Sequence, residues 1–115
     1  MVQPDIDTKA LQKSSAEMIV LALLEQQDRH GYELAKLIES RSDGKMDFHV
    51  ASLYPLLYRL EAKGMVAGRW VERPNERRRR IYKITPTGKR TLALQKQSWR
   101  DFFDTLDRVV QIRPA

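Results

Sequence analysis

The chain has 115 residues, enough for one modest domain, and its 21 lysines and arginines against 15 aspartates and glutamates give a net charge of +6. It contains no cysteine, which excludes a disulfide framework, a thiol nucleophile and a thiolate metal site. The longest apolar run, residues 18–24, is far too short to span a membrane, and the N-terminus lacks a signal-peptide layout, so we expect a soluble, cytoplasmic protein without a membrane partner.

The first expected helix covers residues 16–25. The residues before it are polar and without a pattern, their opening part is expected to be mobile, and Ser14 or Ser15 can cap the helix. Apolar side chains occupy most of the helix circumference, which is more than a helix with one solvated face carries. It is therefore either a central core helix or a helix whose second face meets another subunit.

A second helix is expected over residues 32–41, with its apolar side chains on one side. A polar connection, residues 26–31, precedes it and is closed by glycine, and residues 42–45 have the composition of a turn. Met46 and Phe48 alternate with polar residues, a pattern that allows a very short strand before the next element.

The third expected helix, residues 50–63, has the clearest pattern. Four leucines at spacing i, i+3, i+4 and i+7 form an apolar face that belongs in a core: Leu53, Leu56, Leu57 and Leu60. The opposite face carries small, aromatic and cationic groups and is suited to lie in a groove. Ser52 as the cap would place Pro55 in the first turn, where its missing N–H breaks few hydrogen bonds, and Gly64 would end the helix.

Residues 66–84 predict a β-hairpin with a basic tip. An apolar, β-prone segment is followed by residues 74–76, which supply turn chemistry, and by residues 79–84, which favour the returning strand. Residues 69–83 include seven basic and two acidic side chains, so most of the excess positive charge lies here. Charge concentrated in this way indicates an anionic partner.

The last expected helix begins after Thr85, an N-cap followed by proline at the first helical position, and extends to about Gln111. Its later half repeats apolar side chains every seven residues: Trp99, Phe102, Phe103, Leu106, Val109 and Val110.

The order of these elements predicts a mainly α fold with a β-hairpin wing, a winged helix-turn-helix followed by a long C-terminal dimerisation helix. In such a fold the third helix enters the major groove and the wing crosses phosphates. Residues 1–85 would form the DNA-binding domain with its N-terminal arm. Residues 86–115 would form the dimerisation helix, packed on the same unit.

Several segments together resemble the PadR family of transcriptional regulators: HGYEL at 30–34, SLYPL at 52–56 with RLE at 59–61, KGMV at 63–66 and RRIYKITPTG at 79–88. The match covers nearly the whole chain in the right order. The single long last helix, without a further C-terminal domain, resembles the short, LmrR-like subfamily. The resemblance implies a homodimeric repressor of a palindromic operator, joined through the first and last helices.

The residues expected to contact double-stranded DNA are Tyr32, His49, Ser52, Tyr54, Pro55, Tyr58, Arg59, Arg77, Arg78, Arg79 and Arg80. Strand alternation should turn one or two of the wing arginines away from the DNA. The residues expected at the homodimer interface are Met18, Leu21, Ala22, Trp99, Phe102, Phe103, Leu106, Val109 and Val110. The aromatic stripe of the last helix exceeds what a small domain could cover alone.

In LmrR-like members, tryptophans at the dimer centre stack on flat aromatic drugs, which implies a small aromatic ligand beside Trp99 and Phe103. A second matching tryptophan is not evident, because Trp70 lies in the wing. Trp99 is most simply a residue of the dimer core. Similarly, Tyr54 and Tyr58 can pad the edge of the core instead of touching DNA.

The alternatives from other classes of function are an enzyme and a protein-interaction module. An enzyme is disfavoured because there is no glycine-rich phosphate loop, no histidine pair at metal-ligand spacing and no nucleophile and base motif, and we expect no cofactor or metal. His30 is expected at a helix-turn junction. A winged-helix protein-interaction module without ligand response is the other alternative. Salt-dependent binding to one palindromic duplex would separate the repressor from both.

Overall fold

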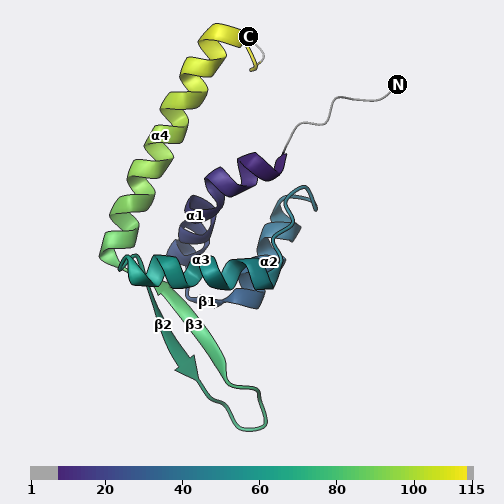
Figure 1. Cartoon of the computed structure of the whole chain (residues 1–115), viewed down its shortest axis with the longest axis vertical. Helices are drawn as coiled ribbons and strands as arrows, with labels where there is room; N and C mark the ends of the chain where they lie inside the picture. The colour runs from purple at the N-terminus through teal and green to yellow at the C-terminus, as the bar shows by residue number, and fades with distance from the viewer. Residues whose placement is uncertain (1–7, 114–115) are drawn as a thin grey trace.

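The computed structural model describes residues 8–113 (Figure 1). Within that range the chain forms four helices and three strands, in the order α1 (Thr8–Gln26), β1 (Arg29–His30), α2 (Gly31–Arg41), α3 (Val50–Ala62), β2 (Val66–Val71), β3 (Arg79–Ile84) and α4 (Pro86–Val110). The predicted fold class is confirmed: a mostly helical chain carries a β-hairpin wing and a long last helix. The predicted mobility of the opening residues concerns a segment outside the described residues.

The apolar core lies where α1, α2, α3 and the base of the wing meet. The four leucines of the α3 face are all buried, as their spacing predicts. They pack with buried residues from every other helix and from two of the strands: Val20, Leu21, Leu23, Leu24, Leu34, Ile38, Val66, Tyr82 and Leu92. The core therefore joins α3 and the base of the wing to the base of α4.

The start of α1 differs from the prediction. The helix begins at Thr8, so Ser14 and Ser15 lie inside it and do not cap it. Their hydroxyls donate hydrogen bonds to the carbonyls of Ala10 and Leu11, one turn earlier, at 3.0 and 2.8 Å. A serine inside a helix can satisfy its hydroxyl in this way, and a sequence pattern does not distinguish it from a cap.

The sheet contains a strand that the sequence did not reveal. Its order is β1-β3-β2, and both pairings are antiparallel, with His30 opposite Ile81 and Gly68 opposite Tyr82. β1 has only two residues, too few for a periodic signal. The prediction that Met46 and Phe48 could form a short strand is wrong, because that segment is irregular and both side chains pack against the core.

The N-terminus of α3 also differs from the prediction. The N-cap is His49, whose side chain makes no capping hydrogen bond, and Ser52 is the third helical residue. Pro55 is consequently beyond the first turn, and its ring removes the hydrogen bond that would reach the carbonyl of Ala51. The predicted end is correct, since Lys63 is the C-cap and Gly64 follows with a φ of 74°.

The base of α4 is fixed to the connection between α3 and the wing. Thr85 caps the helix by accepting a hydrogen bond from the amide of Gly88, and its own hydroxyl donates to the carbonyl of Gly64 at 2.6 Å. Gly88 lies directly against the carbonyl oxygen of Met65, where a Cβ would collide. Only glycine allows the helix to approach this closely.

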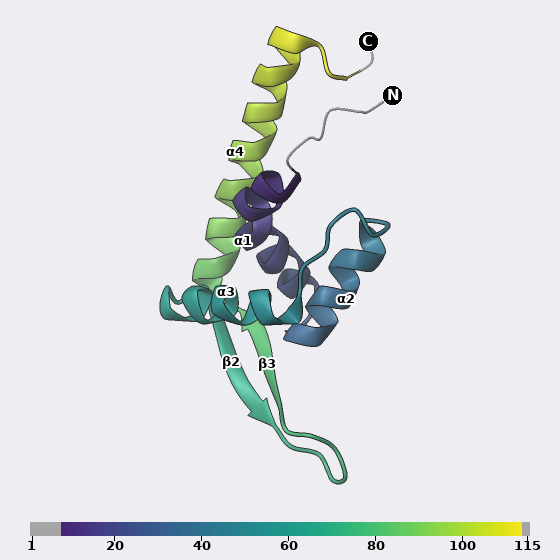
Figure 2. The same ribbon diagram turned by 45° about the vertical axis from the view of Figure 1, so that its right-hand side comes forward.

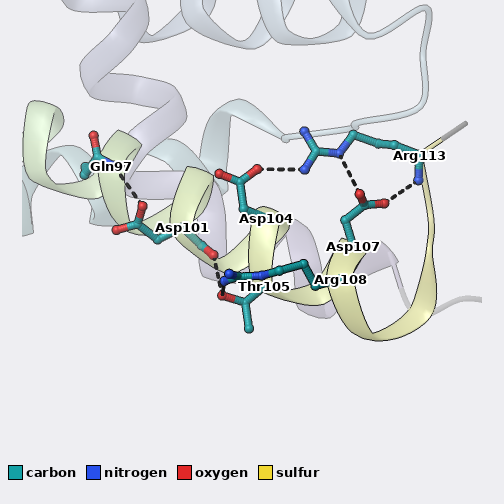
Figure 3. A network of polar contacts seen from close by, with 7 residues as sticks. All are labelled: Gln97, Asp101, Asp104, Thr105, Asp107, Arg108 and Arg113. Atoms are coloured by element: carbon teal, nitrogen blue, oxygen red, sulfur yellow. Dashed lines mark hydrogen bonds and ion pairs between the residues drawn. The ribbon is translucent and has the colours of Figure 1, made fainter. Parts of the chain in front are cut away.

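The far half of α4 stands away from the helical body, on the side opposite the wing (Figures 1 and 2). Gly88 and Leu92 are the only residues of α4 that the described chain buries. At the far end Gln111 adopts a left-handed conformation and the chain turns back, so that Arg113 contacts Asp104 at 2.7 Å and Asp107 at 3.7 Å (Figure 3).

Candidate nucleic-acid interface

A groove of about 440 Å³ separates the N-terminus of α2 and the exposed face of α3 from the wing. We call it the wing groove; its lining is aromatic and cationic and consists of His30, Tyr32, Tyr54, Tyr58, Trp70, Arg77, Arg78, Arg79 and Arg80. Seven of these nine residues were predicted to contact DNA. The structure therefore brings together residues that lie far apart in the sequence.

Tyr54 and Tyr58 occupy the side of α3 that faces the wing. The Tyr54 ring covers Gly31 at the start of α2, where an added Cβ would lie 3.3 Å from the ring. The two tyrosine rings stack with their centroids 6.3 Å apart. Tyr58 is 55% exposed and Tyr54 is 36% exposed, so both rings remain accessible. These positions are compatible with contact to DNA and also with the alternative that the rings pad the edge of the core.

Ser52 and Arg59 are exposed at the other edge of the same α3 surface, and Pro55 is exposed between the two edges. Ser52 and Arg59 line a second hollow, which α1 and α4 complete. The exposed arc of α3 is thus continuous, but only its tyrosine edge belongs to the wing groove. Tyr32 and His49, at the starts of α2 and α3, are exposed as well.

The wing arginines fall into two groups. Arg77, Arg78 and Arg79 are exposed. Arg80 is turned inward and forms an ion pair with Glu61 of α3 at 2.7 Å, with its side chain only 22% exposed. Strand alternation predicted that one or two of the four would turn away, and Arg80 is the one that does. Desolvation opposes its charge, but the hydrogen bond and charge of Glu61 raise the pKa of Arg80.

Trp70 is a lining residue that sequence reasoning placed in the wing but not at the site. Its ring lies beneath Arg78, at 4.4 Å, and beside Arg80, at 5.5 Å. Arg78 also contacts Glu72 at 3.4 Å. The register pairs Trp70 with Arg80 across the hairpin, so this neighbour could have been found once the hairpin turn was fixed.

His30 closes the groove at the start of α2. Its Nδ1 accepts a hydrogen bond from the amide of Glu33, and its own amide donates to the Glu33 carboxylate, so the two form a capping box. Burial lowers the pKa of His30; the Glu33 carboxylate raises it, and Arg79 lowers it further. The net shift of the His30 pKa is downward. The sequence expectation of a junction residue matches this position.

The predicted dimer residues are of three kinds. Phe102, Phe103, Val109 and Val110 are exposed, whereas Trp99, Leu106, Met18 and Ala22 are partly covered. Leu21 has no exposed surface in a single chain and belongs to the apolar core, so it offers no surface to a partner. Leu94 and Ile112 are also exposed apolar residues, but they do not belong to the predicted set.

A three-helix core, a third helix with an accessible polar face and an adjacent basic hairpin together define a winged helix-turn-helix protein. The sequence model of the Transcriptional regulator PadR-like family matches residues 20–94, and the chain belongs to that family. Members of the family are DNA-binding transcriptional regulators and not enzymes, which confirms the expectation that this chain is not an enzyme.

Solved structures support this assignment. A transcriptional regulator from Clostridium thermocellum is similar with a TM-score of 0.80 and 27% identity, over 90% of this chain and 97% of that chain. A PadR family regulator from Eggerthella lenta has a TM-score of 0.78 and 27% identity, over 92% and 90% of the two chains. A PadR-like regulator from Bacillus cereus has a TM-score of 0.76 and 26% identity, over 90% and 99%.

An uncharacterised protein of Lysinibacillus sphaericus is 29% identical over 91 residues, which is 79% of this chain and 84% of that protein. Two further findings concern the described residues alone. None of their helices has the length and hydropathy of a membrane span. Nor do they gather three histidine or acidic side chains in a group that could hold a metal ion.

Proposed function

We propose that this PadR-family regulator is a homodimeric, sequence-specific repressor that binds a palindromic operator in double-stranded DNA. The observation that carries the proposal is the wing groove, in which exposed tyrosines of α3 face exposed arginines of the wing. Base contacts supply sequence specificity, and arginines that neutralise phosphates supply affinity that depends on salt. Both kinds of contact are available on one side of the chain.

Each DNA-binding residue has a role in this proposal. Tyr54, Pro55 and Tyr58, with Ser52 and Arg59 at the far edge of α3, face the bases of the major groove. Tyr32 and His49, at the two helix starts, reach the sugar-phosphate backbone. Arg77, Arg78 and Arg79 contact phosphates along the wing. Arg80 has a different role, because Glu61 already pairs with its charge.

The homodimer is supported by the two faces of α4. On one face, side chains satisfy one another along the helix: Gln97 donates to Asp101 at 2.8 Å, and Thr105 donates to the Asp101 carbonyl at 2.8 Å (Figure 3). On the other face, the described chain leaves most of the apolar stripe that starts at Trp99 uncovered. Phe102 and Phe103 are 56% and 50% exposed. A second copy of the same stripe would cover it.

A palindromic operator follows from that dimer, because two-fold related proteins present two-fold related α3 helices. We assign residues 1–85 to the DNA-binding domain and residues 86–115 to dimerisation. We also propose a cytoplasmic location.

Release by a small aromatic ligand is supported by a ring cluster on α4. Trp99 lies 5.9 Å from Phe103 and 6.5 Å from Phe102, measured between ring centroids. An apolar hollow of about 190 Å³ borders Trp99 and Phe102. Planar aromatic compounds should quench tryptophan fluorescence in a Trp70→Phe background, where Trp99 is the only tryptophan. Trp99→Ala should remove the binding measured by titration calorimetry, which needs no tryptophan. Equal binding after Trp99→Ala would exclude this site.

The decisive experiment selects bound fragments from the source genome and measures affinity for the selected duplex and for random DNA. Tyr54→Ala should weaken operator binding more than random binding, whereas Tyr54→Phe keeps the ring on Gly31 and isolates the contribution of the hydroxyl. Equal loss on both DNAs would remove Tyr54 from base recognition. A chain that binds no duplex at any salt concentration would favour the protein-interaction module instead.

A further inference from the structure

One carboxylate connects the three elements that would contact DNA. Glu61 belongs to the last turn of α3, and its Oε2 accepts a hydrogen bond from the amide of Gly68 in β2 at 2.9 Å. The same oxygen accepts a hydrogen bond from Nη2 of Arg80 in β3 at 2.7 Å. We call this arrangement the Glu61 bridge. Other contacts join the wing to the segment before α2: β3 pairs with β1, and Arg79 Nη1 lies 2.9 Å from Nε2 of His30.

The wing is shaped to admit the Arg80 side chain. Arg80 lies across Gly68, where an added Cβ would be 2.6 Å from Nε of the guanidinium. The guanidinium is also 5.5 Å from the Trp70 ring and 5.7 Å from the Tyr82 ring, measured to the centroids. The absence of a side chain at position 68 therefore lets Arg80 reach Glu61.

The bridge removes Arg80 from the set of cations that face solvent. Glu61 and Arg80 have side-chain exposures of 30% and 22%, whereas the neighbouring pair of Glu72 and Arg78 has exposures of 72% and 56%. A partly buried, charge-assisted pair holds its geometry better than an exposed one. The pair is a direct contact between β3 and α3, whereas Arg79, which precedes Arg80, contacts His30 at 2.9 Å.

We propose that Glu61 is a positioning residue that sets the angle between α3 and the wing, so that the tyrosines of α3 and the exposed wing arginines engage one duplex together. This inference rests on the proposed DNA-binding function. It assigns a favourable role in DNA binding to an acidic residue beside a polyanion. Charge alone predicts the opposite, namely that the carboxylate weakens DNA binding.

The direction in which Glu61→Gln changes DNA affinity tests the proposal. Glu61→Gln removes a negative charge near the DNA, and simple electrostatics predicts tighter binding. Positioning predicts weaker binding, by about tenfold, because a misplaced wing loses contacts that α3 cannot replace. The matched control is Glu72→Gln, which removes the same charge from the wing, where Glu72 contacts Arg78 and not α3, and which should leave affinity unchanged or raise it. Tighter binding by Glu61→Gln would overturn the proposal.

A second variant disturbs the bridge without changing any charge. Gly68→Ala places a methyl group against the Arg80 guanidinium and should weaken DNA binding by a factor similar to that of Glu61→Gln. Combining Glu61→Gln with Arg80→Gln should be no worse than either change alone, because both act through one contact. Fully additive losses would show that Arg80 touches DNA independently. Thermal unfolding of each variant, measured first, identifies the temperature at which all are folded.

A measurement without DNA separates failure of this inference from failure of the proposed function. The chain has no cysteine, so Ala51→Cys and Glu76→Cys can carry nitroxide labels on α3 and on the wing. Diluting the labelled chain with unlabelled chain isolates the distance within one chain. Glu61→Gln should broaden the distribution of label distances, and Glu72→Gln should not. An equally narrow distribution in Glu61→Gln would reject the bridge as the positioning contact, whatever the protein binds.

Discussion

α3 and α4 are both amphipathic, but only one of them has its apolar face covered by its own chain. In α3 the four leucines are between 0% and 6% exposed. In α4 nothing beyond Leu92 is fully buried, and Val109 is 77% exposed. Periodicity alone makes the two helices look equivalent.

The difference between the two faces lies in their surroundings. α3 is enclosed by α1, α2 and the sheet, so its exposed side is the polar one, available to a partner of another kind. The far half of α4 extends past α1, which can cover only its base (Figure 2). The apolar face of α3 is covered within the chain, whereas covering the apolar face of α4 is the role that we propose for a second copy. Substitutions on the apolar face of α3 should therefore affect folding, whereas substitutions on the apolar face of α4 should affect assembly.

The largest expected effect is on the covered face. Leu57→Ala should lower the free energy of unfolding by about 2–5 kcal/mol, because it leaves a cavity in a fully buried site. Urea denaturation followed by circular dichroism measures the change. The control is Leu94→Ala, a leucine of α4 that is 71% exposed, which should change stability by less than about 0.5 kcal/mol. Similar losses in both variants would contradict the comparison.

The next effect is on the uncovered face. Phe103→Asp should dissociate the dimer into 13.5 kDa chains, because a charge would have to be buried between two apolar stripes. Sedimentation equilibrium measures the mass. Leu94→Asp is the matched control, since Leu94 is also exposed but lies off the stripe, and its mass should remain that of a dimer. An unchanged mass for Phe103→Asp would reject this interface.

A third test concerns the exposed arginines of the wing. Replacing Arg77 and Arg78 together with Ala should weaken binding to all DNA sequences and reduce the slope of log affinity against log salt by about 2. The dimer should be unaffected. The control replaces Arg90 and Arg100 of α4, which loses the same charge away from the wing groove. If the control reduces the slope equally, net charge and not wing position explains the binding.

The smallest effect is a pH dependence at the wing groove. Because the pKa of His30 is lowered in the folded chain, the unfolded chain binds the proton more readily, and the free energy of unfolding falls as pH falls below about 6.5. Above that pH the contribution is fully present. His30→Asn keeps a capping oxygen for Glu33 and should reduce this fall in stability. Thermal unfolding at several pH values compares the variant with the unchanged chain; an equal fall in both would contradict this role of His30.

Much of the fold could be predicted because its signals are local. The leucine spacing of α3, the hairpin turn and the Thr85 and Pro86 start of α4 each lie within one short stretch. The errors arose where one residue type fits two environments. Ser14 and Ser15 suit a cap or a helix interior equally well, and the apolar circumference of α1 did not show that Leu21 faces the chain's own core.

The site was predictable in composition but not in geometry. Clustered arginines indicated a basic wing, yet nothing local showed that Arg80 would meet Glu61, which lies 19 positions earlier. Trp70 was missed for the same reason, because its position against Arg78 depends on the register of the hairpin. Contacts between elements carry that information, and a single sequence does not contain them explicitly.

The close approach of Gly88 to Met65 fixes the base of α4, so any tilt of the helix at this point moves its far end. With 25 residues at about 1.5 Å each, the helix is about 37 Å long. A tilt of about 10° at Gly88 would therefore displace the far end by about 6 Å, close to two base-pair steps along a duplex. In a dimer joined through α4, the packing at this single glycine would set how far apart the two half-sites of an operator must lie.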